Sequence, residues 1–237
     1  MTRSSSRSTS RLLGAALLYA VGLLAGCAST APTVSDDDSS LDAAPGAKAL
    51  SNLPATALYE RSLAVRTGST PSFYADTPGR RTYGILGVIA MMREGNRLVE
   101  DFRLDDPAGE LSEELVAALA DQNRMRTSTR DSADLLLDVK TINWDFRPYR
   151  NDPENLYVVY SARVSLLDRH SGAVLASGKC RSQRDREGDS ATLEELLADG
   201  ARRLHDELRE AAHECARRLK RESFAMFLQN VAPVARQ

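Results

Sequence analysis

Cysteine is scarce in this sequence, basic charge is not in excess, and long apolar runs are missing. Three cysteines occur in 237 residues, and 31 basic residues stand against 33 acidic ones. A protein that binds nucleic acid or an anionic surface is expected to carry an excess of positive charge, so we expect no nucleic-acid partner. The uncharged apolar stretch at 12–25 is shorter than the roughly 20 residues that a membrane-spanning helix needs.

Motifs of common catalytic and metal sites are also missing. The chain has no Gly-x-Ser-x-Gly motif, which marks the nucleophile of many hydrolases. Its three histidines are His170, His205 and His213, and the last two are eight positions apart, about 80° around a helix. Zinc sites favour histidines four positions apart or close nitrogen and sulfur clusters. We therefore expect no metal, no cofactor and no enzymatic activity, although the members of a Ser-His-Asp triad need not be adjacent in sequence.

The N-terminus has the charge pattern of a signal peptide. Residues 1–11 carry three arginines and no acid, and residues 12–25 are uncharged and mostly apolar. This pattern predicts a signal peptide over 1–26. Its removal would leave 28 basic and 33 acidic residues, a formal charge of −5.

The four residues Leu24-Ala25-Gly26-Cys27 follow the apolar stretch. They resemble the lipobox of bacterial lipoproteins. The resemblance implies that Cys27 becomes the first residue of the mature chain and carries the lipid that holds it in a membrane. Because Ala28 rather than aspartate follows, the resemblance also implies sorting to the outer membrane, with the chain facing the periplasm. The alternative is an ordinary signal peptide in which Cys27 is incidental.

A composition change separates the N-terminus from the rest of the chain. Residues 28–48 are rich in Ser, Asp, Ala and Pro and hold hardly any large apolar side chain, which is typical of flexible segments. We assign 27–80 to the lipidated cysteine and a mostly flexible tether, with a short helix from about Ala55. A globular domain is expected over 81–228 and a disordered tail over 229–237.

The hydrophobic pattern predicts the elements of the globular domain. The run at 82–92 is expected to be a strand buried on both faces, followed by a turn at 93–96. Further elements are a helix at 109–125, a strand at 133–146 with a bulge or a change of cover after Thr141, a hairpin of 156–168 and 172–183, and a long helix from Thr192 to about Phe227. The expected fold class is α+β, a small mostly antiparallel sheet covered by two helices.

The hairpin register follows from its apolar rows. Pairing Leu166 with Val174 and Val164 with Ala176 places both rows on one face of the sheet. Three residues then connect the strands, and Gly172 supplies the left-handed conformation that such a loop requires.

Two cysteines remain if Cys27 carries lipid. Cys180 shares a strand face with Ala176, and Cys215 shares a helix stripe with Leu204 and Leu208. Both thiols therefore point to one interface between helix and sheet. In an oxidising compartment this predicts a Cys180–Cys215 disulfide, and the alternative is two buried free thiols.

Trp144, Phe146 and Tyr149 cluster just before a loop. They are either core residues or, if exposed, a patch that binds a partner, because aromatic side chains dominate interface energetics.

Three stretches of the sheet carry a further resemblance. They are ADLLLDV (133–139), YVVYSARVSLLD (157–168) and SGAVLASG (171–178). They resemble the sheet of small periplasmic lipoprotein domains of the peptidoglycan-synthase-activator and Tol amino-domain type, and of auxiliary lipoproteins of lipid transporters. The segment around Cys180 and Cys215 is similar to uncharacterised proteobacterial lipoproteins with a paired cysteine.

A lipid anchor, a flexible linker and one compact domain together predict a tethered, non-enzymatic lipoprotein that contacts an unknown envelope protein during envelope assembly or maintenance. One alternative is an accessory lipoprotein of a lipid transport system, which would need an apolar groove between helix and sheet. Another is a periplasmic hydrolase, which would need a polar cleft with a serine or aspartate beside His170 or His205.

Overall fold

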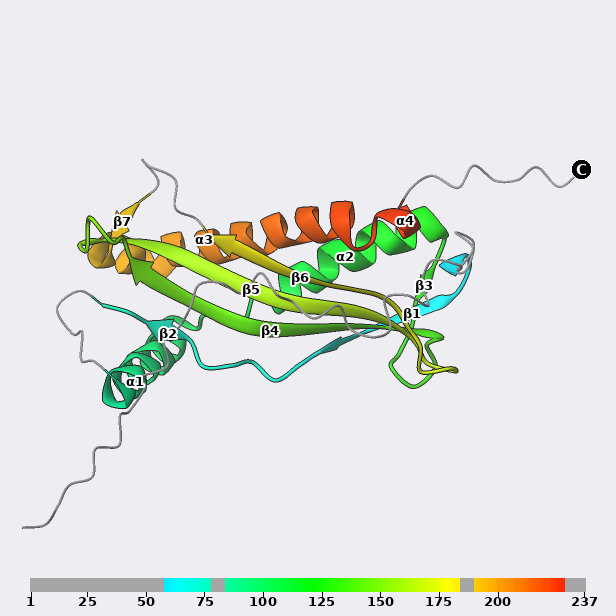
Figure 1. Ribbon diagram of the computed structural model, residues 1–237, viewed down its shortest axis with the longest axis horizontal. Coiled ribbons are helices and arrows are strands. Elements are labelled where there is room, and N and C mark those ends of the chain that lie inside the picture. The colour runs from blue at the N-terminus through cyan, green and yellow to red at the C-terminus, as the bar shows by residue number, and fades with distance from the viewer. Residues whose placement is uncertain (1–57, 78–83, 184–189, 229–237) are drawn as a thin grey trace, which may run out of the picture. The chain divides into compact units, whose positions relative to one another are not determined.

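The computed structural model describes residues 58–77, 84–183 and 190–228 (Figure 1). The signal peptide, Cys27, the segment 28–48 and the tail 229–237 lie outside the described residues. In chain order, the elements are β1 (Ser62–Thr67), β2 (Tyr74–Ala75), α1 (Ile85–Phe102), α2 (Ala108–Asn123), β3 (Arg126–Thr127), β4 (Leu135–Pro148), β5 (Asn155–Asp168), β6 (Val174–Gln183), β7 (Ala191–Thr192), α3 (Leu193–Glu222) and α4 (Ala225–Leu228).

The sheet is mixed rather than mostly antiparallel. Its strand order is β3-β1-β4-β5-β6, with β2 beside β4 and β7 beside β5. The β4–β5 and β5–β6 pairs are antiparallel, as expected, but β1 runs parallel to both β3 and β4. The connection from β1 to β4 includes α1 and α2, and a long crossover of this kind is what a parallel pair needs.

The sheet begins earlier in the chain than the sequence predicted. Strand β1 lies within residues 27–80, where the composition predicted mostly a flexible tether, and the helix expected from about Ala55 does not extend into it. Leu58, Leu63 and Phe73 are buried in the main core. The short strand escaped detection because its burial comes from β4, whose pairing residues lie 72 positions later.

The prediction of a strand at 82–92 and a turn at 93–96 is wrong, because helix α1 covers both from Ile85 onward. Gly84 and Gly87 favoured a strand on propensity grounds, but Gly84 lies just before α1, and Gly87 and Gly95 are buried within it. A Cβ atom on Gly95 would lie 1.8 Å from the carbonyl oxygen of Phe73. The glycine therefore lets the helix approach the backbone just before β2, which propensity alone does not reveal.

The strand predicted at 133–146 contains a β-bulge at the point where its alternation of apolar side chains changes face. The β4–β5 register changes between Thr141 and Asn143, so Ile142 is the extra residue and is exposed. The bulge returns Trp144 to the buried face that also carries Val139.

The β5–β6 hairpin has the expected faces but a different register. Leu166 pairs with Ala176 and Val164 with Gly178, two residues from the predicted pairing. A shift of two by itself keeps each side chain on its predicted face, so Ala176 and Cys180 still face the core. A second bulge after Leu166 leaves Val174 exposed, and Gly172 has the expected positive φ of 72°.

Helix α3 packs on β5, β6 and α2, while α2 also contacts β1 and β4. The predicted capping box is present, with the Thr192 side chain accepting from the Glu195 amide and the Glu195 carboxylate accepting from the Thr192 amide. The helix is interrupted at Ala198–Ala201, where the backbone leaves helical geometry. Among the helices of the described ranges, none is both long enough and apolar enough to cross a membrane.

Candidate functional sites

The structure contains the predicted disulfide. Cys180 on β6 is bonded to Cys215 on α3, and their Cα atoms are 5.3 Å apart. Both residues belong to the main core, so the bond joins the middle of the long helix to the sheet.

The aromatic cluster is a core feature and not an exposed patch. Trp144 is 2% exposed, Phe146 is fully buried, and the ring of Phe73 packs edge-on against both. The indole Nε1 of Trp144 donates to the carbonyl oxygen of Pro71 at 2.8 Å. Tyr149 is half-buried, and its ring centroid lies 4.9 Å from that of Tyr157. The partner-patch prediction is therefore wrong for Trp144 and Phe146, because the β4 bulge turns them inward and Phe73 covers them.

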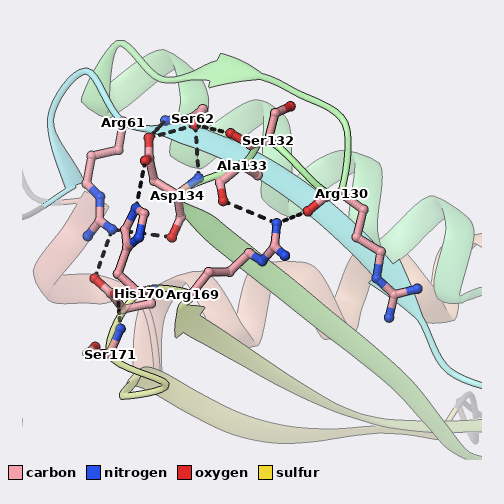
Figure 2. A network of polar contacts seen from close by, with 10 residues as sticks. Arg61, Ser62, Arg130, Ser132, Ala133, Asp134, Arg169, His170 and Ser171 are labelled. Atoms are coloured by element: carbon pink, nitrogen blue, oxygen red, sulfur yellow. Dashed lines mark hydrogen bonds and ion pairs between the residues drawn. The ribbon is translucent and has the colours of Figure 1, made fainter.

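A polar network connects the start of β1, the start of β4 and the β5–β6 loop (Figure 2). Oδ2 of Asp134 accepts from the amide and hydroxyl of Ser62, at 2.9 and 2.6 Å. The other oxygen of Asp134 lies 3.2 Å from Nε2 of His170. The hydrogen bonds from Ser62, with that of His170, lower the pKa of Asp134.

The order of these three groups limits their chemistry. Figure 2 shows the Asp134 carboxylate between Ser62 and the exposed ring of His170. In a catalytic triad the imidazole stands between hydroxyl and carboxylate, where it accepts the serine proton. Here the Ser62 hydroxyl donates to the carboxylate instead. Sequence reasoning missed this network because Ser62 and Asp134 are 72 positions apart.

Asp168 organises the hairpin loop beside the same network. One of its oxygens accepts from the amides of His170 and Ser171, both at 2.9 Å, and the other accepts from Arg61 at 2.8 Å. These hydrogen bonds, led by that of the Ser171 amide, lower the pKa of Asp168 to about 2. The network thus joins β1 to the hairpin and acts as a structural joint.

This joint predicts a pH dependence of stability. A carboxylate with a lowered pKa contributes stability above its ordinary pKa near 4 and loses that contribution as the pH falls through about 2. Asp168→Asn should therefore reduce stability at pH 7. Between pH 4 and 2 the stability of the variant should fall less steeply than that of the wild type. Urea unfolding midpoints at pH 7, 4, 3 and 2 measure both effects.

The matched control is Asp131→Asn, in the exposed turn before β4, which should behave as wild type at every pH. Equal midpoints for wild type and Asp168→Asn across the whole pH range would contradict the role of Asp168.

The other two histidines pack between elements. Nε2 of His205 lies 3.2 Å from the carbonyl oxygen of Phe102. Nδ1 of His213 lies 2.7 Å from the carboxylate of Glu114, which also accepts from Lys220. Burial opposes ionisation of Glu114, but these two hydrogen bonds outweigh it and lower its pKa. Within the described ranges, no cluster of three or more His, Cys, Asp or Glu residues could hold a metal ion.

Apolar side chains fill the interface between α3 and the sheet, where the lipid-handling alternative requires a groove. Buried leucines and alanines of α3 face the buried rows of β5 and β6 in one core cluster. Open grooves instead border α1. One runs along the helix past Ile89, Met92 and Arg93, and another lies between Met91, Tyr74 and the bulged part of β4.

The first turns of α1 expose four large apolar side chains, which we call the α1 apolar face. The exposed fractions are 80% for Ile85, 75% for Leu86, 44% for Val88 and 47% for Ile89. Sequence reasoning missed this surface because it assigned these residues to a buried strand.

Comparisons with known proteins place the chain in no family. No protein-family model matches it, and no curated protein matches it. Similar solved structures include the PelC dodecamer from Paraburkholderia phytofirmans, at 14% identity over 70% of this chain and 89% of that chain, with a TM-score of 0.33. Protein XCC0632 from Xanthomonas campestris, of family DUF330, is 14% identical over 67% of this chain and 82% of that chain, with a TM-score of 0.34.

A minor lipoprotein from Acinetobacter baumannii is 10% identical over 70% of this chain and 91% of that chain, with a TM-score of 0.35. The similar solved structures thus include proteins described as lipoproteins. At these TM-scores the likeness supports no inference about function. The resemblance to peptidoglycan-synthase activators and Tol amino-domains therefore stays a prediction.

Proposed function

We propose that the protein is a lipoprotein of the outer membrane, anchored through Cys27 and facing the periplasm. One observation carries this proposal. The segment Leu24–Cys27 follows directly on an uncharged apolar stretch that is preceded by three arginines and no acid. The proposed role is non-enzymatic and works through contacts with another envelope protein.

The disulfide supports the proposed location in the periplasm. Disulfides persist in oxidising compartments such as the periplasm and are rare in the cytosol. The Cys180–Cys215 bond is buried at the interface of α3 and β6. Two cysteines held in bonding geometry within a core suit a chain that folds after export.

The polar groups described above have partners within the fold, which suits the proposed non-enzymatic role. His170, His205 and His213 each contact a carboxylate or a backbone carbonyl of another element. These contacts join elements of the fold, and the Ser62 hydroxyl is engaged by a carboxylate.

Anchoring is tested by Cys27→Ala. The variant has no thiol to acylate, so the protein should leave the outer-membrane fraction and take up no labelled palmitate. Sucrose-gradient fractionation of cell envelopes and metabolic labelling measure the two effects. Ala28→Ser, which keeps the cysteine, is the matched control and should behave as wild type.

Ala28→Asp tests the sorting separately. It should keep the lipid label and move the protein toward the inner-membrane fraction. The anchoring proposal is wrong if Cys27→Ala still fractionates with the outer membrane and the wild-type protein takes up no label.

A further inference from the structure

The α1 apolar face is exposed because most of its residues lie on the side of the helix that faces away from the rest of the fold. Gly87, Gly95 and Leu98 are buried on the side of α1 that packs on the rest of the fold. At about 100° per residue, Ile85, Leu86 and Ile89 lie on the opposite side. Contiguous exposed apolar side chains on a soluble domain mark interaction sites.

We propose that the α1 apolar face docks into the surface of the membrane that holds the lipid anchor. This inference rests on the proposed function, because it requires the lipid anchor at Cys27 to hold the protein at the membrane. Leu58, the first described residue, is 31 positions after Cys27. At about 3.3–3.6 Å per extended residue, that stretch spans at most roughly 100–110 Å. The anchor thus keeps the domain near the bilayer, and tethering makes a weak second contact effective.

The charges that follow the apolar turns suit a headgroup layer. Arg93 and Arg97 continue the line of Ile89 at four-residue steps, and both are exposed. Amphipathic helices at an interface insert apolar side chains and place basic ones among the headgroups. Glu100 follows on the same side, and the mature chain has a formal charge of −5. Arg97 also forms an ion pair with Asp101 at 3.3 Å. The contact therefore depends mainly on apolar insertion, assisted by the two local arginines, rather than on general attraction to an anionic surface.

The extent of the α1 apolar face argues against a second copy of the chain as its occupant. Its residues fall within the first five positions of an 18-residue helix, and the outward side is charged or polar from Arg93 onward. Pairing of two helices needs an apolar stripe over several turns. A stable protein interface buries about 800 Å² on each partner, which is far more than four side chains provide. Shallow insertion into a bilayer requires no such area.

The proposal is tested by measuring how deeply position 86 enters the bilayer. The full-length lipoprotein carrying Leu86→Trp is reconstituted into vesicles of phosphatidylethanolamine and phosphatidylglycerol. Its tryptophan emission should shift to shorter wavelength and lose intensity when the acyl chains are brominated. The native Trp144 is buried in the core and provides a constant background. Leu86 is largely exposed, so the substitution should preserve the fold, which circular dichroism checks.

The matched control is Asp131→Trp. Asp131 is exposed in the turn before the start of β4, whereas α1 packs on β2, which pairs with Asp145 and Phe146 near the other end of β4. Its emission should not respond to bromination. Adding Ile85→Ser and Ile89→Ser to Leu86→Trp should reduce the bromine quenching, and adding Arg93→Gln and Arg97→Gln should reduce it in anionic vesicles.

The outcomes separate this inference from the proposed anchoring. Quenching of Leu86→Trp no larger than that of the control, in protein that floats with the vesicles, overturns the docking and leaves the anchoring intact. A shift to shorter wavelength without bromine quenching, together with crosslinking between copies, overturns it in favour of self-association. Protein that neither floats nor carries a fatty acid overturns the anchoring and, with it, the docking.

Discussion

Trp144→Ala is expected to lower the free energy of unfolding by about 3–5 kcal/mol, as large-to-small substitutions of buried aromatic residues do. The indole is 2% exposed and packs edge-on against Phe73, with 5.0 Å between ring centroids. Its removal leaves a cavity and deprives the carbonyl oxygen of Pro71 of its donor. Urea denaturation followed by circular dichroism measures the change, since the variant lacks the tryptophan probe.

Two controls divide this effect into its parts. Ile142→Ala alters the exposed bulge residue two positions earlier and should change the free energy by no more than about 0.5 kcal/mol. Trp144→Phe keeps an aromatic ring but not the N–H donor. Its decrease in the free energy of unfolding should therefore fall between those of Trp144→Ala and Ile142→Ala. Equal urea midpoints for wild type and Trp144→Ala would contradict the expected contribution of the buried indole.

Removal of the disulfide is expected to have an effect of similar size. Cys180→Ala combined with Cys215→Ala opens a link between residues 35 positions apart, which contributes about 3–4 kcal/mol in the chain-entropy model. The bond holds α3 to β6 in the core, so its loss also weakens the attachment of the long helix. Chemical denaturation of the oxidised wild type and of the double variant measures the difference.

A reductant provides the control for that experiment. Dithiothreitol should lower the stability of the wild type toward that of the double variant and leave the double variant unchanged. Two free thiols titrated in unfolded wild-type protein from the periplasm would show that the bond does not form in the cell.

Local patterns in the sequence were enough for several elements of this fold. Helix α2, the β5–β6 hairpin and the capping box of Thr192 and Glu195 depend on periodicities and turn chemistry within a few residues of each element. The pairing of Cys180 with Cys215 followed from two such periodicities, because each one placed a thiol on the apolar side of its own element. The bulge after Thr141 was visible as a break in alternation.

Other features depend on contacts between segments far apart in the sequence. Whether Trp144 is core or surface was decided by the bulge together with the ring of Phe73, which lies about 70 positions earlier. The joint at Asp134 and Asp168 likewise requires Ser62 and Arg61, which lie next to them in the sheet but 72 and 107 positions away in the sequence. No local pattern could have predicted these partners.

The sequence alone determined the two strands and the loop glycine of the hairpin, the capping of α3 and the orientation of the two cysteines, because each depends on residues that are neighbours along the chain. The register of the hairpin was decided by the structure. The tertiary structure decided that β1 joins the sheet parallel to β4 and that α1 is a helix. A short apolar run has no periodicity that distinguishes a helix from a buried strand. The choice rests on what the run packs against, and here Gly95 fits against the backbone at Phe73 while the α1 apolar face remains exposed.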